Sequence, residues 1–261
     1  MDMFAGTAEY YDEFRPGLPQ EIVDLIMSKV LIPVALLDLG CGTGRITEQL
    51  ASHFTETIAV DPDKDMVKLA RKRFEASPVS ILHARAEDVD LPKDWRASLV
   101  LICRAFHWMD QKKVLARLES VVAEKGVIAI LSDNSFWHLD DETPWAKTVL
   151  EVLHRYLGAE RRTLLGTYRP PEEFFGRSFT SPVFTELEHY TVPVTREWTI
   201  DQIIGYLYST SFASHAVLKD KAGPFEQELR RELSALSSDG LFIEKNHFSL
   251  LFARRSPEDT L

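Results

Sequence analysis

A glycine-rich loop constrains the fold of this chain more than any other feature. The sequence LDLGCGTG, residues 37–44, separates a short apolar run at 34–39 from a helical pattern at 44–54. Three glycines within five positions let the backbone adopt left-handed conformations and approach a bound ligand closely. A strand, a loop of this kind and a helix in succession predict a ligand-binding turn between a strand and a helix.

Helix and strand patterns alternate around this loop over the first 132 residues. Apolar residues at helical spacing predict helices over 19–30, 44–54, 63–76 and 110–124, the last of them with Gly126 as its C-cap. Short apolar runs predict strands over 34–39, 57–60, 80–83, 97–103 and 126–131. Such alternation predicts a parallel, doubly wound sheet, in which ligands bind outside the carboxyl ends of the strands.

The rest of the chain departs from this alternation. We expect a helix over 144–157 inside a substrate-covering insertion at 133–186, then a strand over 184–194, helices over 200–212 and 224–236, and a strand over 247–254. We therefore expect a single domain over 1–261. Its parts would be a cofactor-binding core with an N-terminal lid segment at 1–132, the insertion, and strands and helices at 187–261 that complete the sheet.

Composition restricts the partners of the protein. Thirty Lys and Arg against forty Asp and Glu give a net charge of −10, which disfavours binding to nucleic acid or to an anionic membrane. Residues 1–30 contain no apolar signal segment, and the longest apolar stretch, interrupted by Pro33, is too short to span a bilayer. With only two cysteines in the chain, we expect a soluble, cytoplasmic protein.

Charged residues at the loop indicate which ligand it binds. Arg45 stands where a dinucleotide-binding fingerprint needs a small residue. Asp38, at the end of the first strand, would repel a pyrophosphate but suits a ligand that carries an ammonium and a sulfonium. Both residues argue against an NAD(P)-dependent oxidoreductase, which is the main alternative from another enzyme class.

Two further acidic segments follow strands. Asp61 ends the second strand, 21 residues after Gly40, where a carboxylate can accept hydrogen bonds from both hydroxyls of a ribose. The alternative for Asp61 is to cap the next helix, a role that Asp63 could fill instead. After the third strand, residues 84–88 could contact the edge of an adenine ring through a backbone N–H and a carboxylate.

The order and spacing of these segments resemble the class I S-adenosylmethionine-dependent methyltransferases. LDLGCGTG is similar to their motif I, VDPDKDMV (60–67) to the ribose-binding motif, ARAEDVDLP (84–92) to the adenine-binding segment, and CRAFHWMD (103–110) to the segment after strand four. AEYYDEFRPG (8–17) and the A-x-H-W pattern at 105–108 look like the small-molecule branch, methyltransferase type 11, with its trans-aconitate methyltransferase-like enzymes. The resemblance covers residues 4–132. Arg85 departs from it, because an acidic residue often precedes the alanine of the adenine segment.

The resemblance implies a seven-stranded, mostly parallel sheet and methyl transfer from S-adenosylmethionine to an O, N or C atom of a small organic acceptor. It implies S-adenosylhomocysteine as a product. We expect no metal, because the eight histidines are scattered without the spacing of metal ligands. Contact with adenine N6 is placed on Glu87, with Asp88 as the alternative, and Arg15 is expected to pair with the methionine carboxylate. The cofactor-binding residues that it implies are Tyr11, Arg15, Asp38, Gly40, Cys41, Gly42, Gly44, Asp61, Pro62, Met66, Ala86, Glu87, Arg104, Ala105 and His107.

Catalysis and acceptor binding are assigned to fewer residues. His107 is the candidate general base, which is needed only if the acceptor is protonated at neutral pH. The expected acceptor-binding residues are Phe136, Trp137, His138, Tyr168, Arg169 and Tyr206. Their aromatic character favours a bulky acceptor, and Arg169 favours an anionic one. A non-catalytic methyltransferase-like interaction domain is the third possibility, which the intact glycine loop and Asp61 argue against.

Overall fold

The structure is a computed structural model that describes residues 6–133, 143–158, 162–163, 166–167 and 179–256. The chain forms two compact units. Unit 1 consists of residues 1–16, 133–170 and 193–247, and unit 2 of residues 17–132, 171–192 and 248–261. The predicted division at residues 132 and 186 stays a prediction, since compactness alone does not define a domain.

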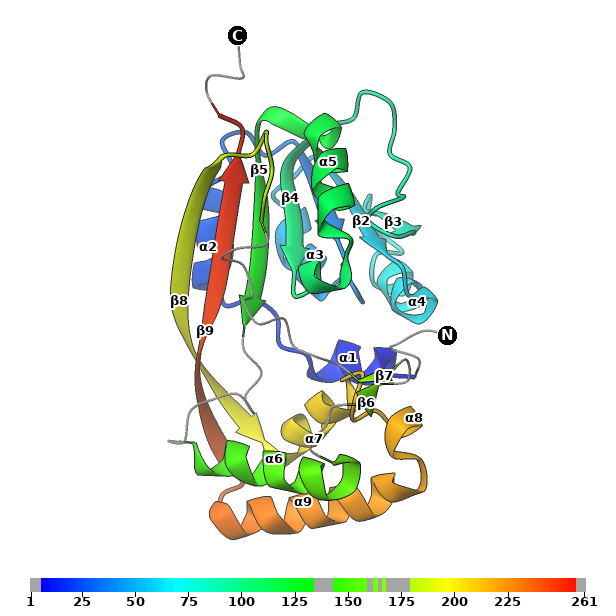
Figure 1. The fold of residues 1–261 in the computed structure, drawn as a ribbon, viewed down its shortest axis with the longest axis vertical. Coiled ribbons are helices and arrows are strands. Elements are labelled where there is room, and N and C mark those ends of the chain that lie inside the picture. The colour runs from blue at the N-terminus through cyan, green and yellow to red at the C-terminus, as the bar shows by residue number, and fades with distance from the viewer. Residues whose placement is uncertain (1–5, 134–142, 159–161, 164–165, 168–178, 257–261) are drawn as a thin grey trace. The chain divides into compact units, whose positions relative to one another are not determined.

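A seven-stranded sheet has the strand order β3-β2-β1-β4-β5-β9-β8 (Figure 1). Strands β1 to β5 pair in parallel, and the arrow of β9 runs opposite to those of β5 and β8. The predicted mostly parallel sheet with an antiparallel hairpin is therefore confirmed. The strands are β1 Ala35–Leu39, β2 Glu56–Asp61, β3 Ser80–His83, β4 Ala97–Cys103, β5 Val122–Asp133, β8 Glu186–Thr199 and β9 Leu241–Arg254.

The core of unit 2 explains why these segments are strands. β1 and β4 are buried along their whole length, as expected for central strands of a parallel sheet that helices cover on both faces. Val100 and Ile102 of β4 and Ile128 and Ile130 of β5 are completely buried. The flanking helices are α2 Gln20–Ser28, α3 Arg45–Ala51, α4 Lys64–Arg73 and α5 Gln111–Val121, with a 3-10 turn at Phe106–Trp108.

The helices and strands predicted between residues 19 and 131 are confirmed with shifted ends, and one prediction in this range is wrong. Gly126 does not cap a helix: α5 ends at Val121, and Gly126 lies inside β5. A Cβ at this position would lie 2.7 Å from the carbonyl oxygen of Ala97 and 2.8 Å from a side-chain carbon of Val122. Gly126 is therefore required because β5 passes close to the backbone of β4, next to an irregularity in their pairing.

Unit 1 is largely helical. The predicted helices over 144–157 and 224–236 are confirmed as α6 and α9, which lie side by side (Figure 1). The helix predicted over 200–212 is confirmed as α7, but it ends at Tyr208. Its core includes Val149, Leu207, Phe225 and Leu229, all completely buried. None of the helices in the described residues combines the length and the apolar character needed to cross a membrane. The elements are α1 Ala8–Phe14, α6 Pro144–Leu157, β6 Arg162–Thr163, β7 Gly166–Thr167, α7 Ile200–Tyr208, α8 His215–Leu218, a 3-10 turn at Lys219–Lys221 and α9 Ala222–Leu236.

Candidate cofactor-binding site

The glycine loop between β1 and α3 has the backbone that the sequence predicts. Gly40, Gly42 and Gly44 have φ values of +76°, +57° and +82°, in the left-handed region that favours glycine. Gly40 also lies against the segment after β4, because a Cβ there would be 2.4 Å from the Cβ of Ala105. The N–H groups of Gly40 and Cys41 donate to the carbonyl oxygen of Val60, at 2.8 and 3.1 Å. The loop is thus fixed to the end of β2.

Thr43 leaves a polar atom without a partner inside this loop. Its side chain is completely buried, and within the described part of the chain its Oγ1 has no hydrogen-bond partner. An unpartnered buried hydroxyl costs about 1–3 kcal/mol. The unpartnered hydroxyl therefore marks an unsatisfied polar position inside the glycine loop.

Asp61, at the end of β2, holds the loop from the other side. Its Oδ2 accepts a hydrogen bond from the N–H of Gly42 at 2.8 Å, and its Oδ1 accepts one from the N–H of Asp63 at 2.9 Å. Burial raises the pKa of Asp61, although these two bonds oppose the shift. Each carboxylate oxygen has a further lone pair, so Asp61 retains the capacity to accept ribose hydroxyls.

The alternative that Asp61 caps the next helix is wrong. Asp63 is the N-cap of α4, and its Oδ1 accepts from the N–H groups of Asp65 and Met66 at 2.9 and 3.0 Å. The two aspartates therefore have different structural roles. Asp63 caps the N-terminus of α4, and Asp61 links β2 to the glycine loop through the N–H of Gly42.

Asp38, the second carboxylate, lies in β1 and is 1% exposed. Its Oδ2 accepts from the hydroxyl of Thr47, in α3, at 2.6 Å. Burial, with a smaller contribution from the charge of Asp61, raises the pKa of Asp38 to about 7. A cation bound nearby would favour the ionised form of both carboxylates.

The adenine segment is fixed by a contact that the sequence does not indicate. Oε1 of Glu87 accepts from the N–H of Asp110, the N-cap of α5, at 2.7 Å, and pairs with Arg85 at 3.2 Å. Burial alone would raise the pKa of Glu87, but the hydrogen bonds from Asp110 and Arg85 hold it below its usual value. Glu87 therefore stays ionised and ties this segment to α5, while Asp88 is exposed. Its contact with adenine stays a prediction.

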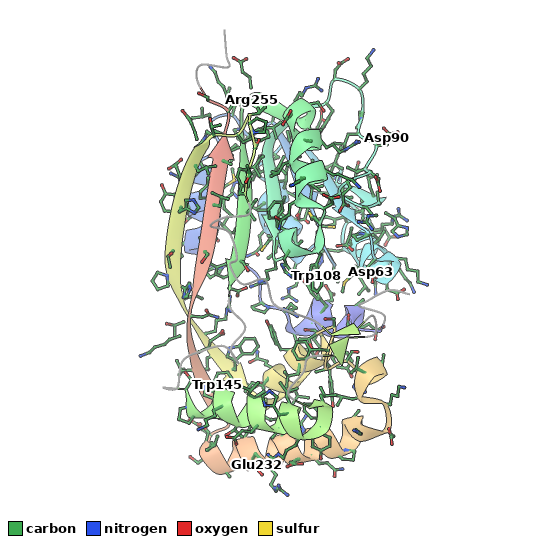
Figure 2. The ribbon with its side chains drawn as sticks, viewed as in Figure 1. Asp63, Asp90, Trp108, Trp145, Glu232 and Arg255 are labelled. Atoms are coloured by element: carbon green, nitrogen blue, oxygen red, sulfur yellow. The ribbon has the colours of Figure 1, made fainter. Side chains whose placement is uncertain are left out.

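The segment after β4 carries His107 and Arg104. Arg104 has a φ of +56°, an unusual backbone for a residue other than glycine, and its guanidinium lies 5.2 Å from the ring centre of Phe248. The ring of His107 packs 4.6 Å from that of Trp108, and burial lowers the pKa of His107 to about 4. Figure 2 shows Trp108 and Asp63 at one end of unit 2 and Arg255 at the other. His107 is thus neutral at pH 7, and its role as a base stays a prediction.

The remaining predicted cofactor-binding residues fall into two groups. In unit 2, Cys41, Met66 and Ala86 are buried, and burial raises the pKa of the Cys41 thiol. In unit 1, Arg15 donates to Ser209 Oγ at 2.8 Å and to the hydroxyl of Tyr206 at 3.0 Å, and lies over the ring of Tyr11. The roles of Tyr11, Arg15, Cys41, Pro62, Met66, Ala86, Arg104 and Ala105 in cofactor binding stay predictions.

Of the predicted acceptor-binding residues, the structure describes Tyr206, which is buried in unit 1. Phe136, Trp137, His138, Tyr168 and Arg169 lie outside the described residues. In the part of the chain that is described, no group of three or more His, Cys, Asp or Glu side chains is arranged to hold a metal ion.

Comparison with known proteins connects this site to a family. A sequence profile described as a methyltransferase domain matches residues 36–126, which include the glycine loop, Asp61 and Glu87. The uncharacterized methyltransferase Rv3342 of Mycobacterium tuberculosis is 29% identical over 156 residues, covering 58% of this chain and 59% of that protein. CRG1 of Saccharomyces cerevisiae, described as a probable S-adenosylmethionine-dependent methyltransferase, is 26% identical over 153 residues, covering 56% of this chain and 50% of that protein.

Among solved structures, a candidate type II methyltransferase from Anaeromyxobacter dehalogenans has the same fold. It aligns with a TM-score of 0.68 at 24% identity, covering 93% of this chain and 98% of that chain. The predicted resemblance to the class I S-adenosylmethionine-dependent methyltransferases is thus confirmed for residues 36–126, which match the methyltransferase-domain profile, and the solved structure shows the same fold. The chain matches between half and three fifths of the length of the two curated relatives, so the activity of the whole protein is a proposal.

Proposed function

We propose that this protein transfers the methyl group of S-adenosylmethionine to an oxygen, nitrogen or carbon atom of a small organic acceptor and releases S-adenosylhomocysteine. One observation carries the proposal. The loop at residues 40–44 combines three left-handed glycines with the buried, unpartnered hydroxyl of Thr43 and with two buried carboxylates, Asp38 and Asp61. This combination suits a ligand that is polar, cationic and closely approached by the backbone.

Each part of the site would take one part of the cofactor. The loop and Asp38 would hold the methionine part, Asp61 the ribose hydroxyls, and Ala86 with Glu87 the adenine. Asp61 supports this assignment because its carboxylate already holds the loop at Gly42 and still has free lone pairs. The carboxylates also argue against a dinucleotide, whose pyrophosphate they would repel.

Bound S-adenosylmethionine supplies a methyl group that its sulfonium has already activated. The residues of this chain then contribute mainly by orienting the cofactor and excluding water. We propose His107 as the group that accepts the acceptor's proton where one must leave. Because burial lowers its pKa to about 4, His107 is neutral at pH 7 and available as a hydrogen-bond acceptor. A pKa this low suits an acidic acceptor better than an aliphatic alcohol.

The remaining features of the proposal follow from the composition. A net charge of −10 favours a small-molecule acceptor over nucleic acid or an anionic membrane, and we propose a cytoplasmic location without a metal cofactor.

Calorimetric titration with S-adenosylhomocysteine and with NAD tests the cofactor. We expect saturable binding of the first and none of the second. Gly42→Val should abolish binding, because valine is strained at a φ of +57° and its branch would enter the ligand's space. Gly240→Val is the matched control: it has a φ of +70°, but the nearest atom to its Cβ is 3.8 Å away, in unit 1. Binding of NAD instead would overturn the proposal.

A screen of acceptors tests the reaction itself. Release of S-adenosylhomocysteine and the gain of one methyl group by mass spectrometry should occur together on the same acceptor. Cofactor binding without transfer to any acceptor would favour the non-catalytic interaction domain.

A further inference from the structure

The two buried carboxylates beside the glycine loop, Asp38 and Asp61, have unequal surroundings. Both oxygens of Asp61 accept a backbone N–H, from Gly42 at 2.8 Å and from Asp63 at 2.9 Å. Within the described part of the chain, Asp38 receives one hydrogen bond, from the hydroxyl of Thr47 at 2.6 Å, and takes part in no ion pair. A buried carboxylate with one donor and no cation is poorly compensated as an anion.

Thr47 orients this carboxylate from the helix that follows the loop. It lies in the first turn of α3, is completely buried, and donates to Oδ2 of Asp38, in β1. The bond therefore joins the strand before the loop to the helix after it. In the residues that the structure describes, no group donates to Oδ1 of Asp38. This second oxygen keeps the capacity to accept a hydrogen bond from a ligand.

The groups around Asp38 make its charge sensitive to a bound cation. Burial raises the pKa of Asp38 to about 7, the bond from Thr47 opposes this shift, and the negative charge of Asp61, in β2, adds to it. Cys41, in the loop, contributes a thiol whose pKa burial raises, with the charges of both aspartates adding to the shift. In β4, the residue paired with Asp38 is the apolar Leu101. The hydroxyl of Thr47 is thus the neighbour that favours the anion.

We propose that Thr47 is a positioning residue that holds Asp38 for a cationic group of the ligand, and that ligand binding releases the proton of Asp38 to the solvent. The inference rests on the proposed function, which supplies a ligand with an ammonium and, in S-adenosylmethionine, a sulfonium. A cation beside a carboxyl group favours its anion, so the proton leaves as the ligand enters. Thr47 is not among the residues that the family resemblance implies.

The affinity then depends on pH in a defined direction. Below the pKa of Asp38 in the unliganded protein, binding must displace a proton, so the affinity falls as the pH falls. Above this pKa the carboxylate is already ionised, and the affinity levels off. Thr47→Val removes the hydroxyl, so the pKa of Asp38 rises further. We expect the pH at which the affinity levels off to rise by about one unit, and the affinity for S-adenosylhomocysteine at pH 7 to fall about fivefold.

Calorimetric titration in buffers of different ionisation enthalpy counts the released protons directly. At pH 7 the wild type should release about half a proton for each S-adenosylhomocysteine bound, because the pKa of Asp38 lies near this pH. Thr47→Val should release about 0.9 protons, since more of its Asp38 is protonated before binding. Asp38→Asn should release none. Release that persists in Asp38→Asn would come from another group, such as Asp61, and would overturn the inference.

The same titration with S-adenosylmethionine identifies the cation that acts on Asp38. If the sulfonium does so, the affinity for S-adenosylmethionine depends more steeply on pH than the affinity for S-adenosylhomocysteine. If the ammonium does so, the two ligands show the same dependence, because both carry it. Either result supports the proposal, since a cation of the ligand displaces the proton in both cases.

Two variants separate this role from a structural one. Thr47→Ser keeps the hydroxyl and should release as many protons as the wild type. Thr57→Val is the matched control, because Thr57 is a threonine of the same sheet, 5% exposed, whose partner in β1 is Leu36. Its hydroxyl makes no bond to Asp38. Thr57→Val should therefore keep the proton count of the wild type, whatever its melting temperature.

The outcomes distinguish this inference from the proposed function. Binding of S-adenosylhomocysteine with equal proton counts in the wild type, Thr47→Val and Asp38→Asn overturns this inference alone. If Asp38→Asn does not fold, equal counts in Thr47→Val and Thr47→Ser overturn it. Failure of the wild type to bind either ligand overturns the proposed function and this inference with it.

Discussion

Replacing Asp61 separates its two roles, because the structure gives its carboxylate a structural contact beside the proposed ligand contact. Its oxygens accept from the N–H groups of Gly42 at 2.8 Å and Asp63 at 2.9 Å. Hydrogen bonds to a charged group are worth about 1.5–3 kcal/mol each, and water entering the space left by the side chain would recover part of this. Asp61→Ala should therefore lower the free energy of unfolding by about 2–4 kcal/mol.

The effect on the ligand is expected in addition to this loss of stability. If Asp61 also accepts both ribose hydroxyls, its removal weakens S-adenosylhomocysteine by at least about tenfold, or about 1.4 kcal/mol. Asp61→Asn should fall between the wild type and Asp61→Ala in stability. The asparagine side chain keeps one oxygen that can accept a hydrogen bond, and it carries no charge that must be buried. Its NH₂ group, however, faces one of the two backbone N–H groups, and two donors cannot bond to each other.

Asp63 provides the matched control, because it too accepts two backbone N–H groups, those of Asp65 and Met66. Asp63→Ala should lower the stability by about 1 kcal/mol, as for the loss of an N-cap, and leave the affinity unchanged. Chemical denaturation and calorimetric titration on the same preparations measure the two quantities. An Asp61→Ala protein that is less stable but binds S-adenosylhomocysteine like the wild type would refute the ribose assignment and leave Asp61 a purely structural residue.

Three further outcomes are expected. Because His107 has a pKa of about 4 in the folded state and about 6.5 in the unfolded state, only the unfolded state takes up its proton between these values, and the wild type should lose up to about 3 kcal/mol of stability as the pH falls from 6.5 to 4. His107→Gln should flatten this part of the curve of unfolding free energy against pH, and an unchanged slope would contradict the lowered pKa of His107. Gly40→Ala should destabilise the protein by more than about 3 kcal/mol, because the added Cβ would lie 2.4 Å from the Cβ of Ala105. Gly240→Ala has a similar φ, but the nearest atom to its Cβ is 3.8 Å away, so it should cost only about 1 kcal/mol, and equal melting temperatures for the two variants would count against the steric argument. Arg196→Met should lower the free energy of unfolding by about 3 kcal/mol or more, because Arg196 pairs with the buried carboxylates of Asp133 at 2.9 Å and Glu244 at 3.4 Å, and the substitution removes the cation from both pairs. A loss below about 1 kcal/mol in urea denaturation would show that these pairs contribute little.

The helices and strands around the glycine loop in unit 2 could be predicted because their sequence signals are local. The loop at 37–44 needs glycine at three positions with positive φ. An apolar strand segment precedes it, and a segment with the apolar spacing of a helix follows it. The sequence predicts a helix end at Gly126 because a glycine after a helical run usually marks one. Glycine is required at position 126 because the carbonyl oxygen of Ala97, in β4, lies too close for a Cβ, and no local sequence pattern indicates this contact.

The helical unit was less predictable because its contacts are distant in the sequence. α1 buries only Ala8 and so lacks the apolar periodicity of a core helix. Its position depends on Gly205 and on bonds such as that of Arg15 to Ser209, which joins residues 194 positions apart. The bond from Asp110 to Glu87 across 23 positions is hidden in the same way, although the acidic residue itself was identified.

Under the proposed function, the buried carboxylates would make the glycine loop selective for a cationic ligand. A left-handed glycine loop before a helix would by itself suit an anion, because it directs backbone N–H groups outward. Here Asp61 accepts the N–H of Gly42, and Asp38, with its pKa raised to about 7, stands in the strand before the loop. An anion would meet these carboxylates and raise their pKa further, whereas a sulfonium and an ammonium would lower it and favour their ionised forms. Under the proposed function, two aspartates near the ends of adjacent strands would thus turn a fold element that binds pyrophosphate elsewhere into a site for a cationic ligand.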